Sequence, residues 1–187
     1  YSKDVKQIQL AVGLPPAHFG MQSRNFVQYF EGRDIIKFEL AGKQYSIYLE
    51  DTACFPQAYA AAATMFQKLV EKQKVLTLDI GGFTADYLMM KYGAADLSIC
   101  DSLENGVILL YNKIRSKISA ELDMLLEESD IDAILLKQKI NYGTEIVQMV
   151  EQEAQKFIND LFSTLRERML DLRTCTVVFV GGGSILL

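Results

Sequence analysis

Residues 76–86 have the sequence LTLDIGGFTAD, which is the most informative segment for the fold. Apolar residues on both sides of the glycine pair predict two buried strands joined by a tight loop. Asp79 stands near the end of the first strand, and Asp86 lies on the returning strand. Because glycine has no Cβ, the backbone at Gly81 and Gly82 can approach a ligand closely and aim successive N–H groups at phosphate oxygens. A hairpin turn that merely contains two glycines is the alternative.

The polar side chains of this loop suit the same ligand. Ionised Asp79 only accepts hydrogen bonds, so it cannot bind phosphate directly, but it can hold a hydrated Mg²⁺ that does. Thr84 follows Phe83 and can donate a hydrogen bond to a phosphate oxygen. The loop therefore predicts a site for phosphate and magnesium.

A second glycine cluster follows a strand near the end of the chain. Residues 177–184 have the sequence VVFVGGGS, in which β-forming residues lead directly into three glycines. Such a backbone leaves room for the base and ribose of a nucleotide, whereas a flexible linker would not normally follow a buried strand. Neither cluster matches the Walker P-loop or the G-x-G-x-x-G turn of dinucleotide-binding domains.

The rest of the chain alternates strand and helix patterns, which predicts an α/β fold with a mixed sheet. The expected strands are 8–12, 35–40, 44–49, 75–80, 85–91, 94–101 and 175–180. The expected helices are 22–30, 57–72, 105–119 and almost all of 120–172, including a long one over 144–170. We expect the helix over 105–119 to lie across the sheet formed by the three strands before it.

Composition excludes several classes of protein. The net charge of −5 and the scattered Lys and Arg residues argue against direct contact with nucleic acid. His18 is the only histidine, and the three cysteines lack the spacing of a zinc site or a disulfide framework, so we expect reduced thiols in a cytoplasmic protein. The apolar run 176–187 is too short for a bilayer and is interrupted by glycines, so we expect no membrane contact.

Together the two clusters resemble the second phosphate motif and the adenosine motif of the superfamily that contains actin, the heat-shock chaperone ATPases and the sugar kinases. Within it, residues 13–16 (GLPP), 56–57 (PQ), 79–84 (DIGGFT) and 181–184 (GGGS) look most like the plasmid-segregation actins of the ParM or StbA type. The resemblance implies a ribonuclease H-like, actin-type α/β lobe with a mixed sheet and a helical inserted subdomain, present here in incomplete form.

The resemblance also implies a division of the chain. Residues 1–56 would end the first lobe, 57–73 would form the helix that connects the lobes, and 74–187 would form the second lobe with its helical insertion at about 120–172. No D-x-G-x-x-N-x-K loop of the first lobe occurs, the chain begins without Met, and it ends on an apolar run. We therefore expect both ends to be cut from a longer protein, and this piece alone to hydrolyse ATP poorly or not at all.

Site residues follow from the matched motifs. Gln57 occupies the position that aligns the attacking water in the relatives, although a residue that only caps its own helix is the alternative. Asp79 would share the catalytic role and hold the metal. The residues expected to bind the nucleotide are Gly81, Gly82, Phe83, Thr84, Gly181, Gly182, Gly183 and Ser184.

The function implied by the resemblance is Mg²⁺-dependent binding and hydrolysis of ATP by a filament-forming protein. Such filaments would segregate plasmid DNA through a separate DNA-binding adaptor. Two alternatives remain open from the sequence. One is a chaperone-like ATPase or a small-molecule kinase of the same fold, and the other is a nucleotide-dependent scaffold that does not hydrolyse ATP.

Overall fold

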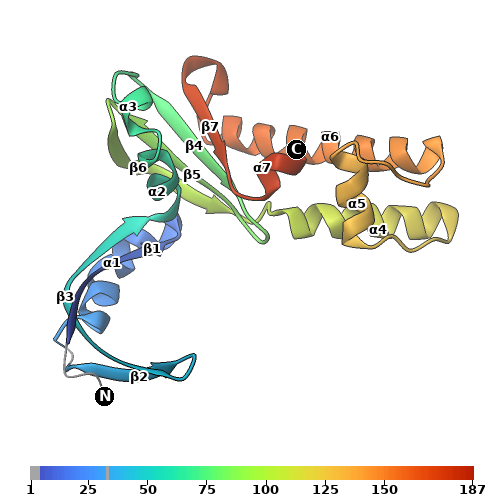
Figure 1. Ribbon diagram of the computed structural model, residues 1–187. Coiled ribbons are helices and arrows are strands. Elements are labelled where there is room, and N and C mark those ends of the chain that lie inside the picture. Colours follow the sequence, from blue (N-terminus) through green and yellow to red (C-terminus); the bar gives the residue numbers. More distant parts are fainter. Residues whose placement is uncertain (1–4, 33) are drawn as a thin grey trace.

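The computed structural model describes residues 5–32 and 34–187, which form two sheets and a group of helices (Figure 1). The strands are β1 (Lys6–Leu14), β2 (Ile36–Leu40), β3 (Lys43–Pro56), β4 (Val75–Ile80), β5 (Ala85–Lys91), β6 (Ala94–Leu103) and β7 (Thr176–Val180). The helices are α1 (Pro16–Phe30), α2 (Gln57–Ala63), α3 (Phe66–Leu69), α4 (Val107–Leu122), α5 (Glu128–Leu135), α6 (Thr144–Glu167) and α7 (Gly183–Leu186), with a 3₁₀ turn η1 (Leu172–Thr174) before β7.

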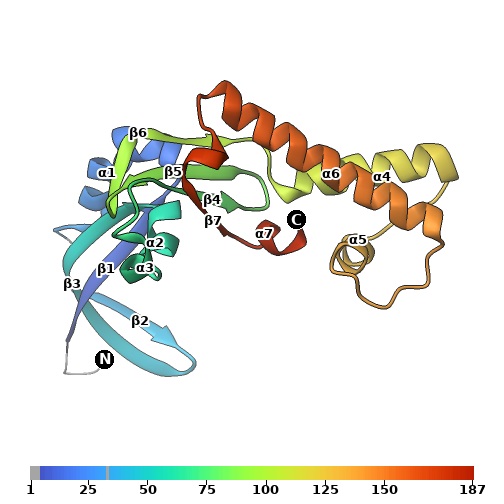
Figure 2. The ribbon, with the colours of Figure 1, turned by 90° about the horizontal axis from the view of Figure 1, so that it is seen from above.

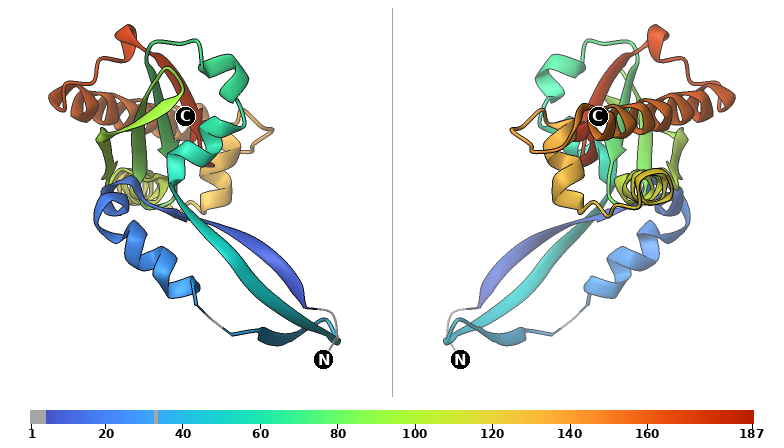
Figure 3. Two further views of the ribbon diagram at one scale, coloured as in Figure 1. Left: turned by 90° about the vertical axis from the view of Figure 1, so that its left-hand side faces the viewer. Right: turned by 90° about the vertical axis from the view of Figure 1, so that its right-hand side faces the viewer.

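The first sheet has the order β1-β3-β2, with β1 parallel and β2 antiparallel to β3. The expected hairpin over 35–49 is confirmed, although its second strand continues to Pro56. Seen from the side, β1 and β3 form a long twisted ribbon that extends away from the second sheet (Figure 3). Before Ala58, the buried residues in the described part of the chain are only Pro16, Ser46, Thr52 and Pro56, so this ribbon and α1 enclose no hydrophobic core of their own.

The second sheet has the order β6-β5-β4-β7 and is mixed, as expected. The strands β4, β5 and β6 form an antiparallel meander, whereas β7 runs parallel to β4. The turn between β5 and β6 uses positive φ angles at Tyr92 (49°) and Gly93 (80°), which suit the right-handed twist of a two-residue hairpin. The central strand β4 is buried on both faces, which explains its almost wholly apolar sequence.

The two faces of this sheet pack against different elements. Leu76, Leu78 and Ile80 join the large core formed with α4, α5 and α6. Val75 lies on the opposite face, in a smaller cluster with residues of α2 and α3. Because side chains alternate along a strand, Asp79 shares the face of Val75, and α1 also contacts β5 and β6. The carboxylate of Asp79 therefore lies on the face nearest the first sheet.

The helix α4 corrects one expectation, because it does not lie across the sheet. Its first turn lies against the loop between β4 and β5, and the helix projects outward beside α6 (Figures 1 and 2). The helix α5 packs against α6. The cause is at its first turn, where Val107 N–H donates to Gly81 O (3.0 Å) and Ile108 N–H donates to Gly82 O (3.0 Å). These bonds fix the start of α4 at the strand tip. No helix in the described ranges is long and apolar enough to cross a lipid bilayer.

Two further expectations for helices were too broad. The region 120–172 contains non-helical segments before α5 and before α6, and positive φ angles mark both, at Asp123 (52°) and Lys137 (56°). The expected helix over 57–72 divides into α2 and α3. At the break, the hydroxyl of Thr64 donates to Ala61 O (2.7 Å), so the side chain competes with the helical backbone.

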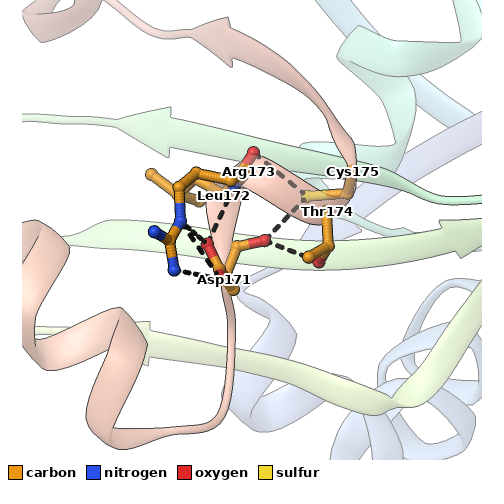
Figure 4. Close-up of polar contacts among 5 residues, drawn as sticks. All are labelled: Asp171, Leu172, Arg173, Thr174 and Cys175. Atoms are coloured by element: carbon orange, nitrogen blue, oxygen red, sulfur yellow. Dashed lines mark hydrogen bonds and ion pairs between the residues drawn. The ribbon is translucent and has the colours of Figure 1, made fainter.

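A compact turn leads from α6 into β7 (Figure 4). The Asp171 carboxylate accepts hydrogen bonds from Arg173 N–H (3.0 Å) and from the Arg173 guanidinium (2.7 Å). The Thr174 hydroxyl donates to Asp171 O (2.8 Å), and Thr176 N–H then donates to Lys74 O (3.0 Å). The turn thus starts β7 in register beside β4.

Candidate functional site

The two glycine clusters meet at the ends of neighbouring strands. In the parallel pair of β4 and β7, Asp79 lies opposite Val180, and Gly181 follows directly. Gly181 has a φ of +83°, and a Cβ at this position would overlap the Asp79 carboxylate and lie 2.5 Å from Ile80 O. Only glycine fits there without strain. The expectation that the two strand tips lie side by side is confirmed.

The loop between β4 and β5 directs its carbonyl groups toward α4. Besides the two bonds to α4 given above, Phe83 O accepts a hydrogen bond from Gly106 N–H (3.2 Å). The Gly81 N–H is used inside the loop, where it donates to Thr84 O (2.8 Å). Across the described part of the chain, the N–H groups of Gly82, Phe83 and Thr84 donate to no protein acceptor. This leaves three consecutive donors for an anion.

Gly106 is a residue of this site that the sequence analysis missed. It precedes α4, and a Cβ on it would overlap the backbone of Gly82 and Phe83. Any larger residue would push α4 away from the loop. The signal that could have identified it is a glycine directly before the first apolar residue of a predicted helix.

The carboxylates of Asp79 and Asp86 face each other across β4 and β5. Asp86 is only 5% exposed, its Oδ2 accepts a hydrogen bond from the Thr84 hydroxyl (3.5 Å), and its Oδ1 has no partner. Burial raises the pKa of Asp79, and the charge of Asp86 raises it further. Burial also raises the pKa of Asp86, while the hydrogen bond from the Thr84 hydroxyl opposes this shift. The Ser102 hydroxyl oxygen is buried beside this pair and has no hydrogen-bond partner.

The residues of the second cluster have different surroundings. A Cβ on Gly182 would meet nothing within 4 Å, whereas one on Gly183 would lie 2.6 Å from the side chains of Ile80 and Val107. The Ser184 hydroxyl donates to Gly181 O (2.7 Å) and closes the turn. Gly182 is therefore the position of this cluster where the backbone surface is open.

An apolar pocket of about 200 Å³ lies beside this turn, between α6, β7 and α7. Its lining residues are Ile80, Ile158, Leu161, Phe162, Phe179, Ser184 and Leu187.

Gln57 lies at the start of α2, away from the two loops in sequence but on an element that joins the two sheets. Its side chain is exposed, and its Cγ lies 3.3 Å from the position that a Cβ on Gly13 would occupy. The rest of α2 packs on β4, β5 and β7, and Ala58 and Ala62 are fully buried there. The structure thus places Gln57 beside the first sheet, on a helix anchored to the second.

The site provides oxygen ligands that suit Mg²⁺ but no complete metal cage. Within residues 5–32 and 34–187, no group of three or more His, Cys, Asp or Glu side chains could hold a metal ion. A nucleotide-bound Mg²⁺ needs only one or two protein carboxylates, because phosphates and water supply its other ligands. Asp79, with Asp86 opposite it, fits that requirement.

Residues 77–187 match the protein family described as "archaeal actin homologue MreB-like, C-terminal". The match covers more than half of the 187 residues and includes both glycine clusters. The chain belongs to this MreB-like family of archaeal actin homologues. The actin-like assignment made from the two motifs is therefore confirmed.

Solved structures share the fold of this MreB-like chain. The archaeal actin homologue Ta0583 in complex with ADP is 17% identical with a TM-score of 0.70, over 96% of this chain and 61% of that one. The apo pSK41 ParM protein is 16% identical with a TM-score of 0.71, over 97% of this chain and 54% of that one. A filament structure of Alp12 is 18% identical with a TM-score of 0.70, over 98% and 59%. The MreB-like chain thus spans 54–61% of the length of these relatives. No curated protein matches it.

Proposed function

We propose that the protein containing this chain binds ATP with Mg²⁺ at the two glycine loops and hydrolyses it. The observation that carries the proposal is the contact between the strand tips, where Gly181 packs directly against Asp79. One ligand with phosphates at one end and a base at the other could span both loops. Two relatives of the same fold were solved with nucleotides, Ta0583 with ADP and a ParM of Bacillus thuringiensis with ATP.

Each loop has a part in this proposal. The free N–H groups of Gly82, Phe83 and Thr84 would bind the phosphates, and Asp79 would hold the hydrated Mg²⁺ that neutralises them. The open backbone at Gly182 would lie against the ribose. The apolar pocket beside Ser184 offers a surface of the kind that a purine ring packs against.

Gln57 is proposed to align the attacking water. A glutamine can both donate and accept hydrogen bonds, so it can orient a water molecule without removing its proton. Its position on α2 supports this role, because α2 joins the first sheet to the sheet that carries both loops. In this proposal, residues 1–56 belong to the first lobe, 57–73 connect the lobes, and 74–187 form the second lobe with its insertion at about 120–172.

We further propose that the protein forms filaments in the cytoplasm and moves plasmid DNA through a DNA-binding adaptor. Two relatives of the same fold were solved as filaments, Alp12 and a 15-stranded ParM filament from Clostridium botulinum. The self-association, the adaptor and the cargo rest on this likeness. Because the chain spans about 60% of its relatives, hydrolysis is proposed for the whole protein, with little or none for this piece alone.

The decisive experiment replaces Gln57 with alanine in the full protein and compares ATP hydrolysis with ADP affinity. We expect hydrolysis to fall by roughly two to three orders of magnitude while ADP affinity stays within about twofold. Replacing Gln67, an exposed glutamine on α3, is the matched control and should change neither quantity. Unchanged hydrolysis in Gln57→Ala would remove Gln57 from the mechanism, and a wild-type protein that binds ATP without hydrolysing it would indicate a scaffold.

A further inference from the structure

Asp86 lies in the middle of a polar row that crosses the second sheet near the strand tips. It pairs with Asp79 on β4 and with Ser102 on β6, so the three side chains share one face. This is the face nearest the first sheet, where α1 contacts β5 and β6. Asp86 is the most enclosed member of the row, with only 5% of its surface exposed.

Fold stability does not explain a carboxylate at this position. None of the ion pairs among the described residues includes Asp86, and its Oδ1 has no hydrogen-bond partner. The charge of His18 on α1 lowers the pKa of Asp86, but His18 does not form an ion pair with it. A buried carboxylate outside an ion pair destabilises the folded state relative to an apolar side chain of similar size. Polar groups left in this condition in a native protein call for a functional explanation.

The contact with Thr84 supplies one. A threonine hydroxyl has a single hydrogen and two lone pairs, and the Thr84 hydroxyl donates its hydrogen to Asp86 Oδ2 (3.5 Å). The distance is long for an O–H···O bond, but such contacts commonly shorten when a ligand fills the site. With its hydrogen committed, the Thr84 oxygen has only lone pairs for the ligand side. It can then accept a hydrogen bond but cannot donate one to a phosphate.

We propose that Asp86 is a positioning residue that orients the Thr84 hydroxyl, so that the Thr84 oxygen accepts a hydrogen bond from a water molecule beside the phosphates. The inference rests on the proposed nucleotide site. It changes the role expected for Thr84 from phosphate donor to water acceptor. Phosphate binding is then left to the free N–H groups of the loop.

The test compares single and double variants of the full protein. Asp86→Leu removes the acceptor and keeps the branch at Cγ but adds volume, Asp86→Asn keeps nearly the same volume and an oxygen that can still accept, and Thr84→Val removes the hydroxyl. Ser102→Ala is the matched control, since it removes a buried oxygen of the same row that has no partner. For each variant the kcat and KM for Mg²⁺-ATP, the Kd for ADP and the midpoint of thermal unfolding are measured.

We expect Asp86→Leu to lower kcat by about tenfold, the loss of one charge-assisted hydrogen bond, with the Kd for ADP unchanged. Asp86→Asn should retain an intermediate kcat. The variant Thr84→Val/Asp86→Leu should be no slower than Thr84→Val alone, and the near-isosteric Asp86→Asn should not unfold at a lower temperature than wild type. Ser102→Ala should match wild type.

Two results would overturn the inference while leaving the proposed function intact. One is an Asp86→Leu protein with wild-type kcat, and the other is a double variant whose loss of kcat is the product of the single losses. A fall in kcat that tracks a fall in unfolding temperature would assign Asp86 to the fold instead. A wild-type protein that binds no ADP would overturn both the inference and the proposed function.

Discussion

Replacing Gly181 with alanine should damage the junction of the two loops, whereas the same change at Gly182 should not. Gly181 has a φ of +83°, a conformation that costs an L-residue about 1–2 kcal/mol. The added Cβ would also press on the Asp79 carboxylate and on Ile80 O, and relieving such overlap typically costs about 1–3 kcal/mol more. We therefore expect Gly181→Ala to lose about 3 kcal/mol of unfolding free energy.

Gly182 is a matched control in the same turn. Its φ of −62° and ψ of −34° are helical, and a Cβ there would meet nothing within 4 Å. Alanine restricts the unfolded chain more than glycine does, so Gly182→Ala should gain about 0.4–1 kcal/mol.

Thermal unfolding of the full protein, followed by far-UV circular dichroism, measures both changes. In a domain of this chain's size about 3 kcal/mol corresponds to a fall of roughly 6–12 °C, so the longer full protein should show a smaller fall for Gly181→Ala, against a small rise for Gly182→Ala. Equal shifts in the two variants would refute the geometry of the junction. If Gly182→Ala instead keeps its unfolding temperature and loses ADP affinity, the loss arises from the ligand, because no protein atom lies near the new Cβ.

Three other perturbations test separate parts of the structure. Gly106→Ala, whose Cβ would overlap the loop backbone, should lose about 2–4 kcal/mol in urea unfolding, whereas Gly143→Ala at the start of α6 meets nothing within 4 Å and should change stability little. Burial raises the pKa of Asp86 above its ordinary value of 3.8, so the folded state binds a proton on the Asp86 carboxylate more tightly than the unfolded state does. The folded state therefore loses stability as pH rises from about 4. Asp86→Asn should therefore gain about 1–2 kcal/mol at pH 7, a gain that should vanish below about pH 4; a gain of equal size at both pH values would contradict this cause. Arg168→Ala should lose about 1 kcal/mol, less at high salt, because the guanidinium forms an ion pair with Asp101, donates to the Tyr87 hydroxyl (3.4 Å) and lies 6.0 Å from the Tyr87 ring centroid. An unchanged urea midpoint would show that these contacts contribute nothing.

The sequence was sufficient to predict the sheet that carries the site. The apolar strands expected over 75–101 and the β-forming residues before Gly181 match the meander and β7. A buried strand can be predicted in this way because its residues are almost all apolar over a short segment. The closeness of the two strand tips followed from placing both strands in one sheet.

Other features depend on contacts between residues far apart in the sequence, which the local sequence pattern does not predict. The helix α4 ends at Asp123 and α5 ends near Lys137, and both residues have positive φ angles. Because neither residue is glycine, the usual sequence signal for a helix end is missing at both positions. The direction of α4 is set by backbone bonds to the loop carbonyls, and the enclosure of Asp86 depends on its register between Asp79 and Ser102. The roles of the individual loop residues remain predictions.

Hydrogen exchange of the full protein with and without ADP and Mg²⁺ shows whether one nucleotide binds across both glycine loops. We expect the segments 80–86 and 180–184 to gain protection together, at the same ADP concentration, because the N–H groups of Gly82, Phe83 and Thr84 have no protein acceptor. The turn at Tyr92 and Gly93, at the other end of β5, should not change. Protection of one segment without the other, or of neither, would contradict a single nucleotide bound across both loops.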